Sequence, residues 1–166
     1  MTMREFEMAQ SPGTALQPDA TPREVLVEFE YSLTSEVALV SPFIDHAMRS
    51  INIFRVTSDI EVDIEVALRE AVLNAIIHGN REDPHKQVYV TIFCEATGEV
   101  AMRIRDEGAG FDSSLLPDPT TPENRMSTHG RGIYLMRALM DEVSFEEGGT
   151  VVHMRKSAHV DPNRSQ

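Results

Sequence analysis

The sequence has little cysteine, few basic residues and no long apolar run. The single cysteine, Cys94, excludes an internal disulfide framework and is typical of a protein from a reducing cytoplasm. No apolar stretch reaches the roughly 18 residues of a membrane-spanning helix, and the N-terminus lacks the apolar core of a signal peptide. We therefore predict a soluble, cytoplasmic protein that does not bind a membrane.

Basic residues are outnumbered, with 15 Lys and Arg against 27 Asp and Glu, which gives a net charge of −12. This balance argues against direct binding to nucleic acid, because no basic patch is available to release counterions from phosphates. Any role in transcription would then act through a protein partner. At 166 residues and 41% apolar content, the chain is long enough for one domain. We place this domain at residues 24–157, between flexible tails at 1–23 and 158–166.

Several catalytic motifs are also missing. No His or Cys grouping has zinc-binding spacing, and there is no Walker-type phosphate loop and no serine elbow. His46 lacks the acidic residue and the downstream proline expected around a histidine-kinase phosphoacceptor. The sequence therefore argues against a zinc enzyme, a Walker-type ATPase and a serine hydrolase.

Apolar periodicity predicts an α+β fold. Residues at every second position are apolar in five segments and mark strands, and apolar spacing of three to four residues marks three helices. The strands are expected at 25–33, in a hairpin at 88–94 and 100–104, and in a hairpin at 143–147 and 150–156; the helices are expected at 35–52, 59–80 and 132–140. Their sum is a two-layer α/β sandwich, with a mixed, mostly antiparallel sheet and helices on one face. Residues 112–128 are polar and proline-rich, which predicts a long functional loop.

The helix at 59–80 carries a polar stripe that lies between two apolar strips. The polar stripe consists of Asp63, Glu70 and Asn74. Polar groups walled by apolar surface are costly unless something binds them. They could be a structural polar pair in a helix–sheet interface. They could instead carry chemistry, with the Asn74 amide oxygen as a Mg²⁺ ligand and the Glu70 carboxylate as a general base. His78 continues the stripe, and we interpret it as a packing or capping residue.

Two glycine-rich segments follow. Asp106 has the phase of the buried face of its strand, and Gly108 and Gly110 would let a flat ring approach the backbone. The alternative is a solvated Asp-Gly turn. Gly130, Arg131 and Gly132 stand directly before a helix, where free N–H groups attract phosphate. Taken alone, such a short glycine motif is more often a flexible hinge and N-terminal cap.

The order of these segments resembles a known family. Residues 70–80 (EAVLNAIIHGN), 106–111 (DEGAGF) and 130–133 (GRGI) are similar to the three conserved boxes of the Bergerat-type (GHKL) ATP-binding fold. That fold is shared by gyrase B, MutL-type repair proteins and histidine kinases. The single-domain form and the wording of 70–80 resemble the bacterial anti-sigma-factor serine/threonine kinases, over residues 25–156.

The resemblance implies a role for each matching residue. Glu70 would be the catalytic base, and Asn74 would bind Mg²⁺ beside the ATP phosphates. Asp106 would recognise the adenine amino group, with Gly108 and Gly110 under the nucleotide and Thr150 supporting the adenine pocket. Gly130, Arg131 and Gly132 would lie by the phosphates, beneath a lid at 113–128. The family often has a basic residue just before these last glycines, where this chain has Ser127, Thr128 and His129.

The resemblance also implies a function. The chain would be an ATP- and Mg²⁺-dependent serine/threonine kinase that sequesters a sigma factor, phosphorylates a STAS-type anti-sigma antagonist and forms a homodimer. A second hypothesis is a non-catalytic ATP-binding module that controls its partner by sequestration alone. A third, a detached histidine-kinase catalytic domain, would need a phosphoacceptor helix pair that the residues before the first strand cannot supply.

Overall fold

The computed structural model of the protein describes residues 25–53, 58–111 and 131–158. The predicted N-terminal tail, the lid at 113–128 and Gly130 lie outside these residues, as does the predicted C-terminal tail apart from residue 158. The predicted domain boundaries therefore stay predictions.

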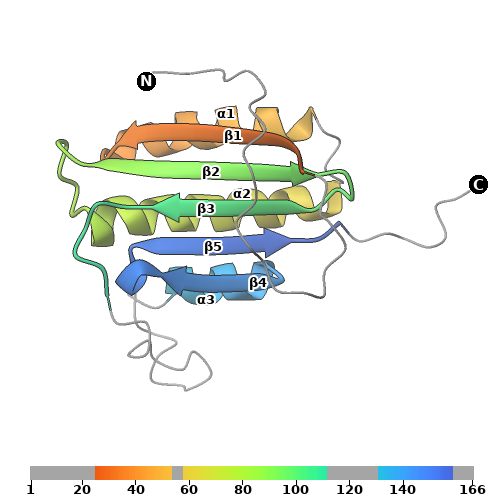
Figure 1. The fold of residues 1–166 in the computed structure, drawn as a ribbon. Coiled ribbons are helices and arrows are strands. Elements are labelled where there is room, and N and C mark those ends of the chain that lie inside the picture. Colours follow the sequence, from red (N-terminus) through yellow and green to blue (C-terminus); the bar gives the residue numbers. More distant parts are fainter. Residues whose placement is uncertain (1–24, 54–57, 112–130, 159–166) are drawn as a thin grey trace, which may run out of the picture.

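The described strands form one five-stranded sheet in the order β1-β2-β3-β5-β4 (Figure 1). The strands are β1 (Val25–Thr34), β2 (Gln87–Glu95), β3 (Val100–Arg105), β4 (Glu142–Glu146) and β5 (Val151–Lys156). All four neighbouring pairs are antiparallel. Both predicted hairpins are present, and the α+β fold class is confirmed, with no parallel pair among the described strands.

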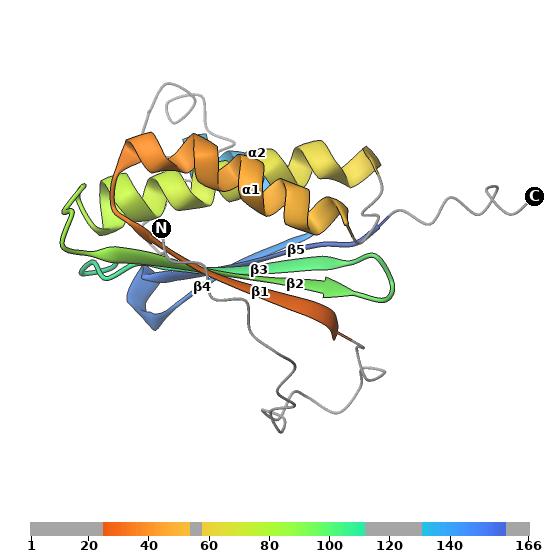
Figure 2. The same ribbon diagram turned by 90° about the horizontal axis from the view of Figure 1, so that it is seen from above.

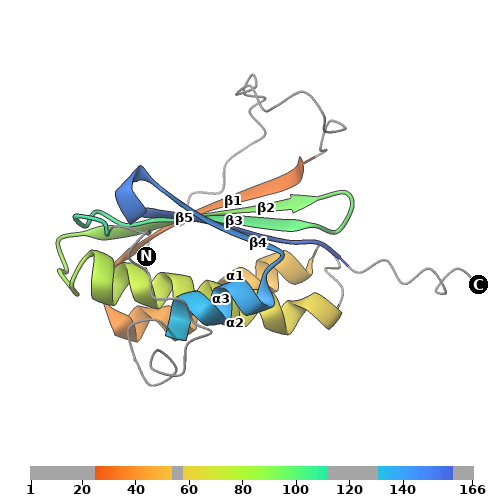
Figure 3. The same ribbon diagram turned by 90° about the horizontal axis from the view of Figure 1, so that it is seen from below.

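The helices cover one face of the sheet (Figures 2 and 3). They are α1 (Val40–Asn52), α2 (Ser58–Asn74) and α3 (Arg131–Leu139). The predicted helix at 59–80 is not uniform, because its last turn, η2 (Ala75–Gly79), is a π-helix. The predicted helix at 35–52 starts later than expected, with a short 3₁₀ turn, η1 (Val37–Leu39), before α1. A second 3₁₀ turn, η5 (Glu147–Gly149), joins β4 to β5.

The core lies between the helices and the sheet. The alternate residues predicted to face inward on β2 and β3 are buried, namely Val88, Val90, Ile92, Cys94, Val100, Met102 and Ile104. They meet the buried faces of α1 and α2, which include Ile44, Ile51, Ile64 and Leu68. Burial raises the pKa of the Cys94 thiol to about 11, which keeps it protonated. Among the described residues, no helix is long and apolar enough to cross a membrane.

Candidate functional site

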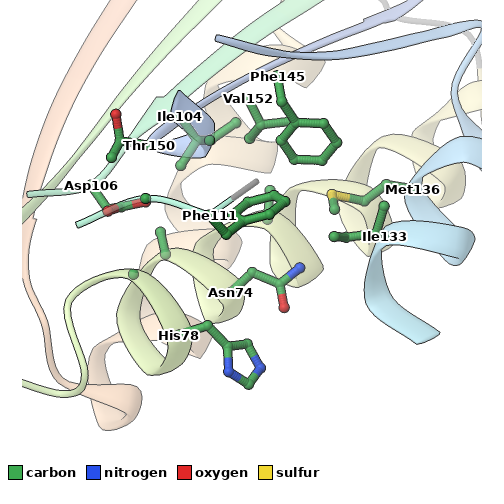
Figure 4. Close-up of a pocket in the computed structure, with 15 residues that line it drawn as sticks. Asn74, His78, Ile104, Asp106, Phe111, Ile133, Met136, Phe145, Thr150 and Val152 are labelled. Carbon is green, nitrogen blue, oxygen red and sulfur yellow. The ribbon is translucent and has the colours of Figure 1, made fainter. Parts of the chain in front are cut away.

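A cavity of about 240 Å³ opens between the sheet and helices α2 and α3 (Figure 4). Its lining comes from segments far apart in the sequence: Ala71, Asn74, Ala75, His78, Gly79, Ile104, Asp106, Gly110, Phe111, Ile133, Met136, Phe145, Gly149, Thr150 and Val152. Most of these side chains are apolar, and the polar ones form two groups, Asp106 with Thr150 and Asn74 with His78 (Figure 4). Such a cavity suits a flat apolar group whose position is fixed by a few polar contacts.

Asp106 is the buried polar group of this cavity. It follows β3 directly, and its side chain is only 9% exposed. Its Oδ1 accepts a hydrogen bond from the Gly108 N–H at 2.8 Å, and its own N–H donates to the Thr150 carbonyl oxygen at 3.0 Å. Burial raises the pKa of the Asp106 carboxyl above its usual value; the Gly108 bond and the charges of Lys86 and Arg105 oppose this only in part. A buried carboxylate of this kind can accept a further hydrogen bond from a ligand's amino group.

Two glycines allow the backbone to pack against Asp106. A Cβ added at Gly79, the last residue of η2, would overlap the Asp106 carboxyl group. A Cβ added at Gly108 would overlap the Gly79 carbonyl oxygen. The end of the helix and the turn after β3 can therefore touch only because both positions lack a side chain.

An aromatic pair forms another part of the cavity wall. The rings of Phe111 and Phe145 meet edge to face, with centroids 5.4 Å apart. The Phe111 N–H donates to the Gly148 carbonyl oxygen at 2.8 Å. Gly110, at φ +74°, makes the turn before Phe111, and any Cβ there would overlap the same oxygen. The turn after β3 is thus tied to the β4–β5 connection, with the rings facing the cavity (Figure 4).

Glu70 and Asn74 lie beside the first turn of α3. A Cβ added at Gly132 would lie 2.7 Å from Glu70 Oε2 and 3.1 Å from Asn74 Nδ2. Both side chains are partly exposed, and Asn74 lines the cavity. A helix N-terminus carries free N–H groups and a partial positive charge, which favour an anion. The arrangement therefore places a carboxylate, an amide and a helix N-terminus together, at a different part of the cavity from Asp106.

A family model described as "Histidine kinase-like ATPase domain" matches residues 33–156, well over half of the chain. Similar proteins include the anti-sigma F factor of Geobacillus thermodenitrificans, 39% identical over 107 residues that cover 60% of this chain and 71% of the relative. The anti-sigma F factor of Bacillus cytotoxicus is 41% identical over 101 residues, covering 57% of this chain and 67% of the relative. The chain belongs to the histidine kinase-like ATPase family. This confirms the resemblance predicted from the three boxes.

Membership of this ATPase family implies ATP as the ligand of the domain, and the described residues fit it. The buried Asp106 carboxylate could accept the amino group of adenine, and the apolar wall suits the flat base. The described residues contain no group of three His, Cys, Asp or Glu side chains that could hold a metal ion alone. Mg²⁺ commonly reaches such sites on substrate phosphates with one or two protein ligands, and the Asn74 amide oxygen could be such a ligand.

Some of the predicted site residues line the cavity, and others lie next to residues that line it. Asn74, Asp106, Gly110 and Thr150 line the cavity. Glu70, Gly108 and Gly132 are not among the lining residues, but Gly108 lies against Asp106, and Glu70 and Asn74 lie beside Gly132. The Thr150 hydroxyl donates to the Glu147 carbonyl oxygen at 3.0 Å. Arg131 is the first residue of α3.

Asp63, the third member of the predicted polar stripe, has a structural role. Its carboxylate pairs with Lys156 Nζ at 2.9 Å, and the same ammonium group donates to the Leu139 carbonyl oxygen at 2.6 Å. Lys156 therefore ties the end of β5 to α2 and to the C-terminus of α3. His78, which the sequence suggested was a packing residue, is exposed and lines the cavity.

Sequence reasoning missed the apolar residues of the cavity. Ile133, Met136 and Phe145 have the periodicity of ordinary core positions, so nothing in the pattern separates them from the core. Phe111 carried a signal, because it directly follows the Asp106–Gly110 turn. Asn80 was noted only as the end of a helix, yet it is 1% exposed and fully hydrogen-bonded.

Proposed function

We propose that this protein is an ATP- and Mg²⁺-dependent serine/threonine kinase that acts as an anti-sigma factor. It would sequester a sigma factor and phosphorylate a STAS-type antagonist of that inhibition. The observation that carries the proposal is the position of Glu70 and Asn74 against Gly132 on α3, at one part of a cavity that has buried Asp106 at another. A single nucleotide can be held by its base at Asp106 and by its phosphates at the α3 N-terminus.

Asp106 recognises the base in this proposal. Its carboxylate accepts a hydrogen bond from the adenine amino group, while Gly108 and Gly110 keep the backbone close to the ring. Phe111 and Thr150 line the same pocket and limit how the base can lie. A pocket built around a hydrogen-bond acceptor rejects a base that offers a carbonyl oxygen at that position.

Glu70 acts as the general base. Its carboxylate takes the proton of the substrate hydroxyl as the hydroxyl oxygen attacks the γ-phosphorus, and the bond to the bridging oxygen of ADP breaks. When bound, Mg²⁺ supplies charge that neutralises the triphosphate, and Asn74 would hold it through its amide oxygen. The first turn of α3, with Arg131 and Gly132 and with Gly130 just before it, holds the γ-phosphate for in-line transfer.

The partners follow from the relatives. The similar proteins are named anti-sigma F factors, which supports a sigma factor as the protein bound by this chain. The net charge of −12 favours a basic segment on that partner over nucleic acid. A homodimer and a cytoplasmic location complete the proposal.

Transfer of label from γ-³²P-ATP tests the kinase proposal. The purified chain would be incubated with Mg²⁺, labelled ATP and a STAS-domain protein from the same genome. We expect acid-stable label on a serine or threonine of the STAS protein. ATP binding without transfer would sink the kinase proposal and leave the non-catalytic ATP-binding module. Acid-labile label would point to histidine phosphorylation.

A further inference from the structure

The residue after the π-turn, Asn80, has an unusually complete set of hydrogen bonds. Its Nδ2 donates to Ser35 Oγ at 2.6 Å and to the Gln87 carbonyl oxygen at 2.9 Å. Its Oδ1 accepts from the Glu107 N–H at 2.7 Å. Both amide hydrogens are used, and the side chain is 1% exposed. The two backbone partners fix the orientation of the amide, because a flipped side chain would set its oxygen against the Gln87 carbonyl oxygen and its NH₂ group against the Glu107 N–H.

Glu107 closes these contacts into a ring. Its carboxylate accepts from the Gln87 N–H at 2.8 Å and from the Tyr89 hydroxyl at 3.1 Å. Asn80, Gln87 and Glu107 thus bond to one another in a closed triangle, which we name the Asn80 clasp. It joins the end of η2, the start of β2 and the turn after β3.

The clasp stands next to the base-recognising end of the cavity. Two neighbouring contacts join the helix end to the turn after β3. Gly79 packs on the Asp106 carboxyl group, and the next residue, Asn80, accepts a hydrogen bond from the Glu107 N–H. Asp106 is therefore fixed to the same helix that carries Asn74. The distance between the two proposed ends of the nucleotide site depends on this junction.

The junction is held in a backbone conformation that is costly by itself. The Asn80 N–H closes the π-turn onto the Ala75 carbonyl oxygen at 2.8 Å. The next two residues, Arg81 and Glu82, both have positive φ, at 59° and 55°. Non-glycine residues adopt this conformation only where the surroundings require it. Here the Glu82 N–H donates to the Ile76 carbonyl oxygen at 2.8 Å, and the Asn80 side chain holds the residue directly before this segment through its bonds to Gln87 and Glu107.

We propose that Asn80 is a positioning residue for base recognition, which holds the Asp106 carboxylate in the orientation that selects an amino group on the base. This inference rests on the proposed ATP site. It differs from a role in general stability, because it predicts a change in selectivity between bases. Loss of the amide would free the Asp106–Glu107 turn to move, and the carboxylate would no longer discriminate between an amino group and a carbonyl group.

The test compares the dissociation constants of ADP and IDP for the 166-residue chain. The two nucleotides differ in the amino group on the base, which is a carbonyl group in IDP. We expect the wild-type protein to prefer ADP by about 10- to 100-fold, the range of a hydrogen bond to a charged group. Asn80→Ala should reduce that preference to within about 3-fold of unity. Ile51→Val provides a matched control, because it removes a buried methyl group in α1 away from the cavity and should keep the wild-type preference.

The outcomes separate the two levels of the proposal. A wild-type protein that binds neither nucleotide, or binds both equally, would overturn the proposed base recognition. A folded Asn80→Ala variant with the wild-type preference would overturn the role of Asn80 alone. If Asn80→Ala does not fold, Glu107→Ala loosens the same turn from its exposed side and should lower the preference at least 3-fold, about 0.65 kcal/mol by the tenfold rule. An unchanged preference in that variant would also overturn the clasp.

Discussion

The two ends of the cavity are built differently. Asp106 is buried, bonded to Gly108 and enclosed by backbone that approaches through Gly79 and Gly108. Glu70 and Asn74 are partly exposed, and the ends of their side chains lie beside Gly132 of α3. A rigid end suits recognition of a base, whose shape never changes. An open end suits phosphoryl transfer, because a second substrate must reach the γ-phosphate.

The largest expected effect is on phosphoryl transfer, after substitution of Glu70, the proposed general base at the open end. Glu70→Gln keeps the size of the side chain and removes the proton acceptor. We expect transfer of label from γ-³²P-ATP to fall about 10²- to 10⁴-fold, the usual contribution of general acid–base catalysis. Nucleotide affinity should stay at the wild-type value.

The matched control is Glu65→Gln on the same helix. Glu65 pairs with Arg69 on the helix surface at 3.3 Å and does not line the cavity. Its replacement should leave transfer unchanged. Equal transfer by Glu70→Gln and wild type would show that the base is assigned to the wrong residue.

A methyl group at Gly132 should disturb the same end more mildly. In Gly132→Ala the new Cβ would press on Glu70 Oε2 and Asn74 Nδ2, which are ends of side chains and can move aside. We expect little change in stability and a loss of transfer of about 100-fold, since a small misplacement of catalytic groups is costly. Thermal unfolding and label transfer on the same preparation would measure both.

Gly108→Ala gives the corresponding test of the rigid end. There the new Cβ meets the Gly79 backbone, which cannot move aside without shifting η2. We expect a loss of stability of about 1–3 kcal/mol, as for other overpacked sites. If Gly132→Ala were the more destabilising of the two, the contrast between the ends would be wrong.

Asp106→Asn should affect nucleotide binding. The amide can still accept a hydrogen bond, but it loses the charge that strengthens the bond to an amino group. We expect ADP affinity to fall about 10- to 100-fold, measured by calorimetry. If this variant bound ADP with wild-type affinity, Asp106 would not contact the nucleotide as proposed.

The smallest expected effect concerns the dependence of stability on pH. Burial raises the pKa of the Asp106 carboxyl above its usual value. The folded protein therefore holds this proton to higher pH than the unfolded chain, and stability is lost as pH rises through that interval. Asp106→Asn should unfold at a higher temperature than wild type near neutral pH, with the difference shrinking on acidification. A variant less stable than wild type at neutral pH would contradict this account.

The fold was largely predictable because burial leaves a period in the sequence. Strands β2 and β3 have apolar residues at every second position, and each residue predicted to face inward on them is buried. The π-turn at the end of α2 was not predictable in this way. The Asn80 N–H closes this turn on the Ala75 carbonyl oxygen, and the Asn80 side chain bonds to Glu107, which is 27 residues away and meets it only in the folded chain.

The candidate site was predictable in part. Glu70 and Asn74 were found as polar groups between apolar strips, but the same pattern included Asp63, which forms a structural ion pair with Lys156. Only tertiary contacts distinguish these two cases. Phe145 was missed for a related reason, because an apolar side chain that lines a ligand cavity has the same periodicity as one in the core.

The central claim is that one cavity separates recognition from transfer, and the kinetics of two variants test it most directly. Transfer of phosphate to the STAS-domain protein would be measured over a range of ATP concentrations for Asp106→Asn and Glu70→Gln. We predict that Asp106→Asn raises KM for ATP and keeps most of kcat, whereas Glu70→Gln keeps KM and loses kcat. If both substitutions changed the same constant, the division of the cavity into two ends would be contradicted.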